Sequence, residues 1–262
     1  MSRYLIQTDK EVSVVERAAL YLLDEPFERS DLANLSALDK NPSLCPVGSV
    51  EFVQAWIRHL GLVEPKPIDY PFSLYRFLGR EVWVKQGVHL LLASSFPIFV
   101  KPVATKAWAG RVLTTDSDLT GLDGPVLVSD VVQFNEEFRV YVLKQGTDPA
   151  KILFVGRYDN LDCGLETAPP GVISKAKEMI QVFERGADNH SYPCAYALDI
   201  GITDTGKILL VEVTDAWAVG LYKPNIGAYP SYRKDYFKWL HARWEQIVAE
   251  SAGRQTFSEE LQ

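Results

Sequence analysis

The feature that most constrains the fold is a change of hydrophobic period after Pro97. From there, apolar and polar residues alternate over short runs, the pattern of half-buried β-strands. Strict alternation of strand and helix is missing from this part of the sequence, which argues against a doubly wound dinucleotide-binding fold. Strands are expected over residues 98–103, 111–114, 126–132, 138–143, 151–158, 195–203 and 208–214, with helices over 172–185 and 231–250.

The region before Pro97 has a different character. Helical periodicity predicts helices over residues 11–24 and 49–60, with a polar segment between them. A proline-rich stretch at residues 64–71 then marks an internal boundary. The sequence therefore predicts an α+β protein with antiparallel sheets and flanking helices, preceded by a small α/β N-terminal region. We place the two regions at residues 1–90 and 91–262.

Charge and composition exclude several functional classes. The chain has 27 Lys and Arg residues against 34 Asp and Glu residues, a net charge of −7, so it lacks the basic field that broad nucleic-acid binding needs. No apolar run reaches the roughly 18 residues of a membrane helix, and the first residues are too polar for a secretory signal. The 3 widely spaced cysteines fit neither a disulfide framework nor a zinc site. We expect a cytoplasmic protein in a reducing compartment.

One familiar motif is misleading. Gly201 to Ile208 has the spacing of a GxxxxGK phosphate-binding loop, but Ile208 stands where Ser or Thr would bind magnesium. A strand-like run follows, instead of the helix whose N-terminus would face the phosphates. A hairpin turn at Gly206 is the better interpretation. The 4 histidines have no metal-ligand spacing, and the sequence contains no GxSxG nucleophile elbow.

The strongest chemical signal is the pair Asp199 and Glu212 on the two strands of this hairpin. A two-residue or four-residue turn places them directly opposite each other. Cross-strand neighbours have Cβ atoms about 5 Å apart, and like charges there are destabilising unless a cation lies between them. Carboxylate oxygens at this spacing suit Mg²⁺ together with phosphate oxygens. An ordinary polar edge, or carboxylates paired with Lys or Arg, explains the pair equally well.

Cations on neighbouring segments supply the opposite charge. Lys101 lies on a regular face of an expected strand, and residues 106–110 combine cations with small residues, as suits a mobile flap over phosphate. Glu137 and Arg139 share one face of a later strand, where a guanidinium can bind a phosphate or acyl oxygen through two hydrogen bonds. Exposed strand faces are the alternative explanation.

Taken in order, these pieces resemble an ATP-grasp domain, in particular the compact clade found in small bacterial and phage-encoded proteins. The resemblance covers residues 97–222 and extends weakly to residues 48–53 and Arg80. It rests on the combination of Lys101 before a proline, the small-residue loop, a hinge strand at residues 126–132, an acid-Phe segment, and Asp199 ahead of Glu212.

The resemblance implies roles for the matching positions. Lys101 would hold the α and β phosphates, and Lys106 would close over them with its loop. The hinge would contact adenine, and Glu137 would accept hydrogen bonds from the ribose. Arg139, with Arg80, would stabilise the transferred phosphoryl group. The implied nucleotide-binding residues are Lys101, Lys106, Asp130, Val131, Val132 and Glu137, and the implied Mg²⁺ ligands are Asp199, Glu212, Thr214 and Asp215.

Two positions depart from the family pattern. The usual Glu-x-Asn of the metal strand reads Glu212-Val-Thr214, so that Thr214 or Asp215 would replace the amide oxygen. The Arg that many family ligases carry two residues before the metal Asp is Ala197 here, with Arg139 as the candidate replacement.

The resemblance also implies a reaction. It indicates an ATP-dependent carboxylate–amine ligase that forms an acyl phosphate from Mg-ATP and a carboxylate, which an amine then attacks. Residues 1–90 would lie on the substrate side and residues 91–262 would bind the nucleotide. A kinase with a hydroxyl acceptor, or a nucleotide-binding module without turnover, are the alternatives.

Overall fold

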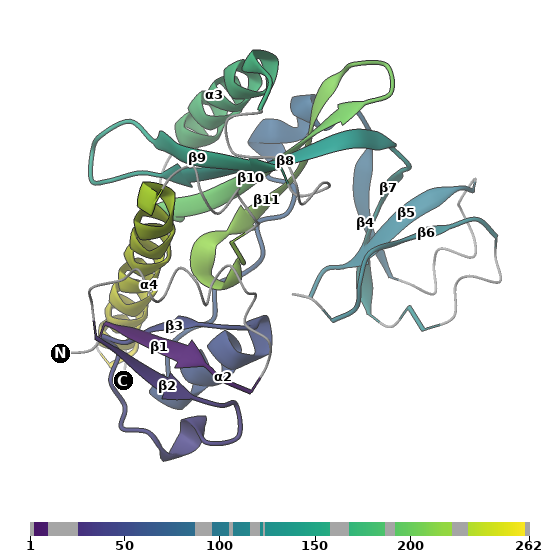
Figure 1. Ribbon diagram of the computed structural model, residues 1–262. Coiled ribbons are helices and arrows are strands. Elements are labelled where there is room, and N and C mark those ends of the chain that lie inside the picture. The colour runs from purple at the N-terminus through teal and green to yellow at the C-terminus, as the bar shows by residue number, and fades with distance from the viewer. Residues whose placement is uncertain are drawn as a thin grey trace.

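The computed structural model describes residues 3–9, 26–86, 96–104, 107–115, 121–122, 124–157, 168–186, 192–221 and 230–259 (Figure 1). The strands are β1 (Tyr4–Gln7), β2 (Phe27–Ser30), β3 (Cys45–Val47), β4 (Val82–Gln86), β5 (Ile98–Pro102), β6 (Arg111–Leu113), β7 (Pro125–Asp130), β8 (Phe134–Leu143), β9 (Lys151–Arg157), β10 (Ala195–Thr203) and β11 (Ile208–Asp215). The helices are α2 (Val50–Leu60), α3 (Pro170–Arg185) and α4 (Pro230–Glu259), with 3-10 segments η1 (Leu35–Ala37), η2 (Phe72–Phe77) and η6 (Ala216–Ala218).

These strands form three sheets. The N-terminal sheet is parallel, in the order β2-β1-β3. The lysine sheet, named for Lys101, is antiparallel in the order β4-β7-β5-β6, and the carboxylate sheet, which carries Asp199 and Glu212, is antiparallel in the order β11-β10-β8-β9. Residues 131–133 are the direct connection from the lysine sheet to the carboxylate sheet, since β7 ends at Asp130 and β8 begins at Phe134.

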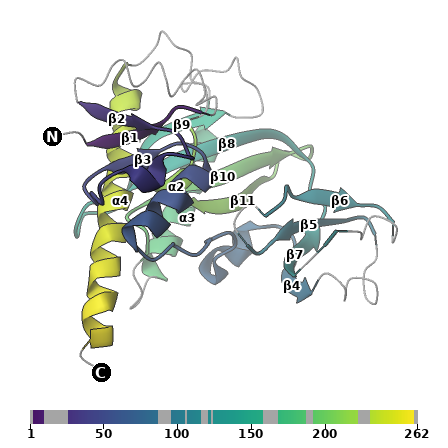
Figure 2. The ribbon, with the colours of Figure 1, turned by 90° about the horizontal axis from the view of Figure 1, so that it is seen from below.

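Alternation along the strands of the carboxylate sheet gives it two different faces. Phe138, Val140 and Val142 of β8 join a buried cluster with α3, which covers one face (Figures 1 and 2). Tyr141 of the same strand belongs instead to the cluster on the other face, formed with α2, α4 and the N-terminal sheet. The C-terminal helix therefore shares its core with the N-terminal region, and the carboxylate sheet lies between two packed layers.

Local signals explain helix α2. The Ser49 hydroxyl accepts a 3.3 Å hydrogen bond from the backbone N–H of Phe52, which caps the N-terminus. Gly61 ends the helix with φ of 72°, a left-handed conformation that favours glycine. Phe52 and Trp56 are both fully buried against the N-terminal sheet's core. Capping and periodicity in the sequence agree, which is why this helix was predictable almost to the residue.

Most expected elements are found. Each of the seven strands predicted after Pro97 is present with small changes at its ends, as are the helices predicted from residues 49, 172 and 231. The α+β class and the α/β N-terminal region are confirmed. The helix predicted over residues 11–24 lies outside the described residues. Sequence analysis missed the four strands β1 to β4, which are short and lack a clear two-residue period.

Strand β4 bears on the expected regional boundary. Although it precedes residue 90, β4 pairs along its whole length with β7, from Val82 opposite Ser129 to Gln86 opposite Pro125. The lysine sheet therefore begins before the boundary expected at residue 90. An exposed edge strand such as this one, with Val84 59% exposed, carries little of the hydrophobic alternation that marks a strand in sequence.

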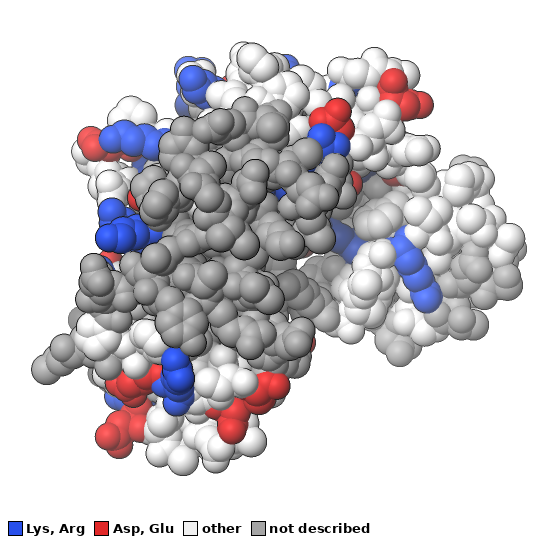
Figure 3. All heavy atoms as spheres, viewed as in Figure 1, with Lys and Arg blue, Asp and Glu red and all other residues white. Residues whose placement is uncertain are grey.

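The described surface agrees with the mixed charge of the sequence. Over the described part of the face in Figure 3, acidic and basic side chains are interspersed. Among the described residues, no helix combines the length and the apolar character required to cross a lipid bilayer.

Candidate functional site

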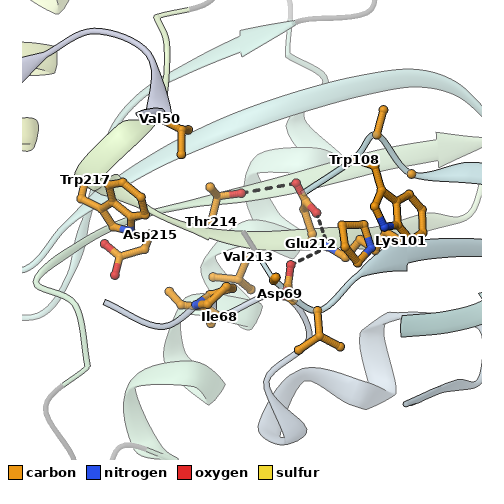
Figure 4. Close-up of a pocket in the computed structure, with 16 residues that line it drawn as sticks. Val50, Ile68, Asp69, Lys101, Trp108, Glu212, Val213, Thr214, Asp215 and Trp217 are labelled. Atoms are coloured by element: carbon orange, nitrogen blue, oxygen red, sulfur yellow. Dashed lines mark hydrogen bonds and ion pairs between the residues drawn. The ribbon is translucent and has the colours of Figure 1, made fainter. Parts of the chain in front are cut away.

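A cavity of about 250 Å³ lies where β5 of the lysine sheet approaches β11 of the carboxylate sheet (Figure 4). The chain between α2 and η2 closes it from a third direction through residues 67–69. Its polar lining comes from Asp69, Lys101, Glu212, Thr214 and Asp215. Three segments that are distant in sequence thus converge on one small space.

The predicted pair of carboxylates is present. Asp199 of β10 lies directly opposite Glu212 of β11, as predicted from the hairpin, and Arg139 of β8 lies opposite Asp199 on its other side. The three side chains thus form a row across three adjacent strands. Arg139 Nε and Nη2 donate to the two Asp199 oxygens at 2.7 and 2.6 Å, and Asp199 is 1% exposed. A bidentate ion pair therefore satisfies the buried Asp199.

The register around this pair depends on a β-bulge that sequence reasoning missed. Near the turn, Ile200 pairs with Leu210 and Ile202 with Ile208, a register that would place Val211 opposite Asp199. The register shifts between Asp199 and Ile200, so that Glu212 takes that position instead. The predicted pairing is therefore correct, but an extra residue in β11 is what produces it.

Arg80 holds this bulge. Its guanidinium donates hydrogen bonds to the backbone carbonyls of Leu210 and Val211 at 3.0 and 2.8 Å, and to that of Leu78 at 3.2 Å. It also lies over the ring of Tyr70, with the guanidinium carbon 5.4 Å from the centroid. This differs from the expectation that Arg80 faces a phosphoryl group, because its donors are directed at the backbone of β11.

Lys101 occupies the centre of the site. Its Nζ donates to Glu212 Oε2 at 2.7 Å and to Asp69 Oδ1 at 2.5 Å, and it lies 4.6 Å from the centroid of the Tyr70 ring. Gly110 stands beside it, where an added Cβ would come within 2.6 Å of Phe99 and 3.3 Å of Lys101 Cβ. A glycine is therefore required for this close approach next to the lysine.

Burial and charge set the pKa values of these groups. Burial alone would raise the pKa of Glu212 and lower that of Lys101, but each partner reverses the effect on the other. The pKa of Glu212 is therefore lowered and that of Lys101 raised, so both groups are charged near neutral pH. Burial raises the pKa of Asp69, which Lys101 only partly offsets.

The two residues after Glu212 in the expected ligand set have different environments. The Thr214 hydroxyl lies beside Glu212, donating to its Oε1 at 3.5 Å. Asp215 is 6% exposed and accepts two hydrogen bonds, at 2.7 and 2.8 Å, from Arg243 of α4. Of these two candidate substitutes for the family's amide, Thr214 shares the surroundings of Glu212 while Asp215 is bound to a helix.

Asp69 is the site residue that sequence analysis did not identify. It lies within the proline-rich stretch that was interpreted only as a boundary, and isolated carboxylates in such stretches are usually solvated. Its position depends on a single backbone bridge to Val213, in which Val213 N donates to Asp69 O at 2.8 Å. No periodicity in the sequence predicts a contact of that kind.

The comparisons with known families agree with this geometry. Residues 77–231 match a family model of the ATP-grasp domain, the second family of its clade within the ATP-grasp superfamily. The chain belongs to this family. The ATP-grasp resemblance and the assignment to the compact clade drawn from the sequence are thereby confirmed. No curated protein matches the sequence.

Solved structures show the same fold at low identity. N5-carboxyaminoimidazole synthase from Aspergillus clavatus, in complex with ADP and its ribonucleotide ligand, aligns with a TM-score of 0.53 at 12% identity, covering 92% of this chain and 77% of that one. N5-carboxyaminoimidazole ribonucleotide synthetase from Thermotoga maritima aligns with a TM-score of 0.53 at 12% identity, covering 92% and 76%. These likenesses establish the ATP-grasp fold of this family member.

The hinge residues expected to contact adenine lie at the connection between the two sheets. Asp130 ends β7, where its Oδ2 accepts a 3.3 Å hydrogen bond from the backbone of Glu81, and Val131 is 40% exposed. Val132 follows in the same connection, and Glu137 lies on β8 opposite Gly201 of β10. Lys106, expected to close over the phosphates, lies outside the described residues.

The oxygen donors at the cavity fit a divalent cation only in part. Asp69, Glu212 and Thr214 line it, a donor set of two carboxylates and a hydroxyl that suits Mg²⁺ completed by phosphate oxygens. Asp199 and Arg139 are not among the described residues that line it. Within the described ranges, no three His, Cys, Asp or Glu side chains gather as a metal cluster.

Proposed function

We propose that this protein is an ATP-dependent carboxylate–amine ligase whose nucleotide phosphates bind in the cavity around Lys101. The observation that carries the proposal is the convergence of Lys101 from one sheet with Glu212 from the other, beside the hinge and within an ATP-grasp fold. ATP and Mg²⁺ are the proposed cofactors. The solved relatives named above support nucleotide binding at this fold, since the Aspergillus enzyme was solved as a complex with ADP.

The proposed chemistry has two steps. An oxygen of the substrate carboxylate attacks the γ phosphorus of ATP, and the bond to the bridging oxygen breaks to release ADP and leave an acyl phosphate. The amine then attacks the acyl carbon, loses a proton and expels inorganic phosphate, forming the amide. Such a reaction needs no protein nucleophile, only positioning and neutralisation of charge.

Each residue contributes to charge and position. The Lys101 ammonium binds phosphate oxygens, and Glu212 with Thr214 would hold Mg²⁺, which supplies charge neutralisation at the phosphates. Arg139 fixes Asp199 behind Glu212, because two of its nitrogens are bonded to that carboxylate. Asp130, Val131, Val132 and Glu137 are proposed to contact the adenosine.

The test is product analysis with purified protein, Mg-ATP and panels of amino acids or short peptides. A ligase releases ADP and free phosphate while joining two molecules, which mass spectrometry detects. Phosphate retained on a hydroxyl substrate would show a kinase instead, and tight Mg-ATP binding with no turnover across the panel would show a binding module. Failure to bind Mg-ATP at all would contradict the proposal.

A further inference from the structure

One carboxylate of the site comes from outside the family domain. Asp69 precedes the matched residues 77–231, yet its Oδ1 lies 2.5 Å from Lys101 Nζ and its side chain lines the same cavity as Glu212. In Figure 4 the side chains of Asp69 and Glu212 approach Lys101 together. The chain between α2 and η2 therefore completes the surroundings of the lysine.

The backbone at Asp69 is fixed in an uncommon conformation. Its φ is +50°, which costs a residue other than glycine roughly 1 kcal/mol, although Asp tolerates it better than most. The bridge from Asp69 to Val213 ties it to the residue that immediately follows Glu212. Such strain persists only where surrounding contacts over-determine it, and it concentrates at functional sites. The two carboxylates on Lys101 are thus held together as one unit.

The charges of this unit do not balance. Arg139 neutralises Asp199, but Lys101 alone faces both Asp69 and Glu212, which leaves one net negative charge at the cavity. Polyphosphate adds further negative charge and competes for the same ammonium. When the ammonium turns to phosphate, two carboxylates that had shared one cation face each other and need another.

We propose that Asp69, together with Glu212, receives the divalent cation that accompanies the nucleotide, in exchange for the Lys101 ammonium that both carboxylates hold in the nucleotide-free protein. The inference rests on the proposed function and assigns to Asp69 a role that the family's late-strand residues do not include. Asp69 thereby makes nucleotide binding depend on the metal: it repels bare phosphates and favours metal-bound ones.

The experiment measures ADP affinity by calorimetry in excess Mg²⁺ and in excess chelator, for wild type, Asp69→Asn and Asp69→Gly. Glycine fits the positive φ, so this second variant removes the carboxylate without adding strain. The expected result is a fall of about tenfold or more in the ratio of the two affinities, with tighter binding in chelator. Electron paramagnetic resonance of Mn²⁺ with ADP should show a matching loss of bound metal.

Asp204→Asn is the matched control, because Asp204 is exposed in the turn between β10 and β11, away from the cavity lining. It should keep the wild-type ratio. If wild type depends on Mg²⁺ and both Asp69 variants depend on it equally, the role of Asp69 is overturned while the proposed function stands. If wild type binds no ADP under either condition, the proposed function and this role are both overturned.

Discussion

Two kinds of ion pair occur within a few residues of one another in β11. Asp215 with Arg243 and Asp199 with Arg139 are one-to-one, bidentate and almost completely buried. Lys101 instead faces two carboxylates and lines a cavity. The balanced pairs satisfy every charge internally, as structural pairs must in an apolar interior. The unbalanced group is satisfied only by adding something, which is what distinguishes a ligand site from a structural one.

The largest effect should come from the unbalanced group. We expect Lys101→Ala and Glu212→Ala each to lower turnover by about 10³-fold or more with the fold retained, because each removes a charge that acts on the phosphates. Steady-state ADP release measures this, with circular dichroism to check folding. Lys207→Ala, in the exposed hairpin turn, is the matched control. Near-normal turnover in both site variants would show that the site is wrongly assigned.

The balanced pair should instead affect stability. Asp215→Asn leaves the buried Arg243 without its carboxylate, and we expect the free energy of unfolding to fall by about 3 kcal/mol. Urea denaturation measures it, and Asp235→Asn, at a surface pair of 3.9 Å with Lys238, should change it by less than about 1 kcal/mol. Unchanged stability combined with a lost Mg²⁺ dependence would make Asp215 a metal ligand, as the family spacing suggested.

How much of this difference is visible in sequence depends on the range of the interaction. The hairpin and the pairing of Asp199 with Glu212 follow from local rules of strands and turns, and so does the alternation that puts Arg139 on the charged face. The bulge at Val211 has no such local signal. Asp69 is harder still, because only the folded chain brings residue 69 to residue 213.

Sequence alone also left open whether Asp199 binds metal or pairs with a cation. Both patterns require a carboxylate in apolar surroundings, and the identity of the partner depends on which strand lies next to β10. The structure gives β8 and therefore Arg139 as the neighbour. Strand order is a tertiary property, so the two interpretations could be separated only by the fold.

Arg80 tests whether the position of Glu212 depends on the bulge. We expect Arg80→Lys and Arg80→Met to raise KM for Mg-ATP to a similar degree, about tenfold, since neither can bridge the two carbonyls at the bulge. Arg76→Met, at an exposed ion pair, is the control. A normal KM in the Arg80→Lys variant alone would mean that charge matters rather than geometry, and would favour the phosphoryl contact expected from the sequence.

The smallest effect should separate the two carboxylates that share Lys101. The lowered pKa of Glu212 means that its charge stabilises the fold above its ordinary pKa of 4.5, and that this stabilisation is lost as pH falls through the lower folded value. The raised pKa of Asp69 has the opposite sign: ionisation costs stability as pH rises from 3.8 through its folded value. Urea unfolding at several pH values between about 3 and 7 should therefore show wild type gaining stability over Glu212→Gln, and losing it relative to Asp69→Asn, as pH rises. Differences that do not vary with pH, or that share one sign, would show that the two carboxylates are equivalent partners of the lysine, and the charge imbalance would then have no measurable cost in the fold.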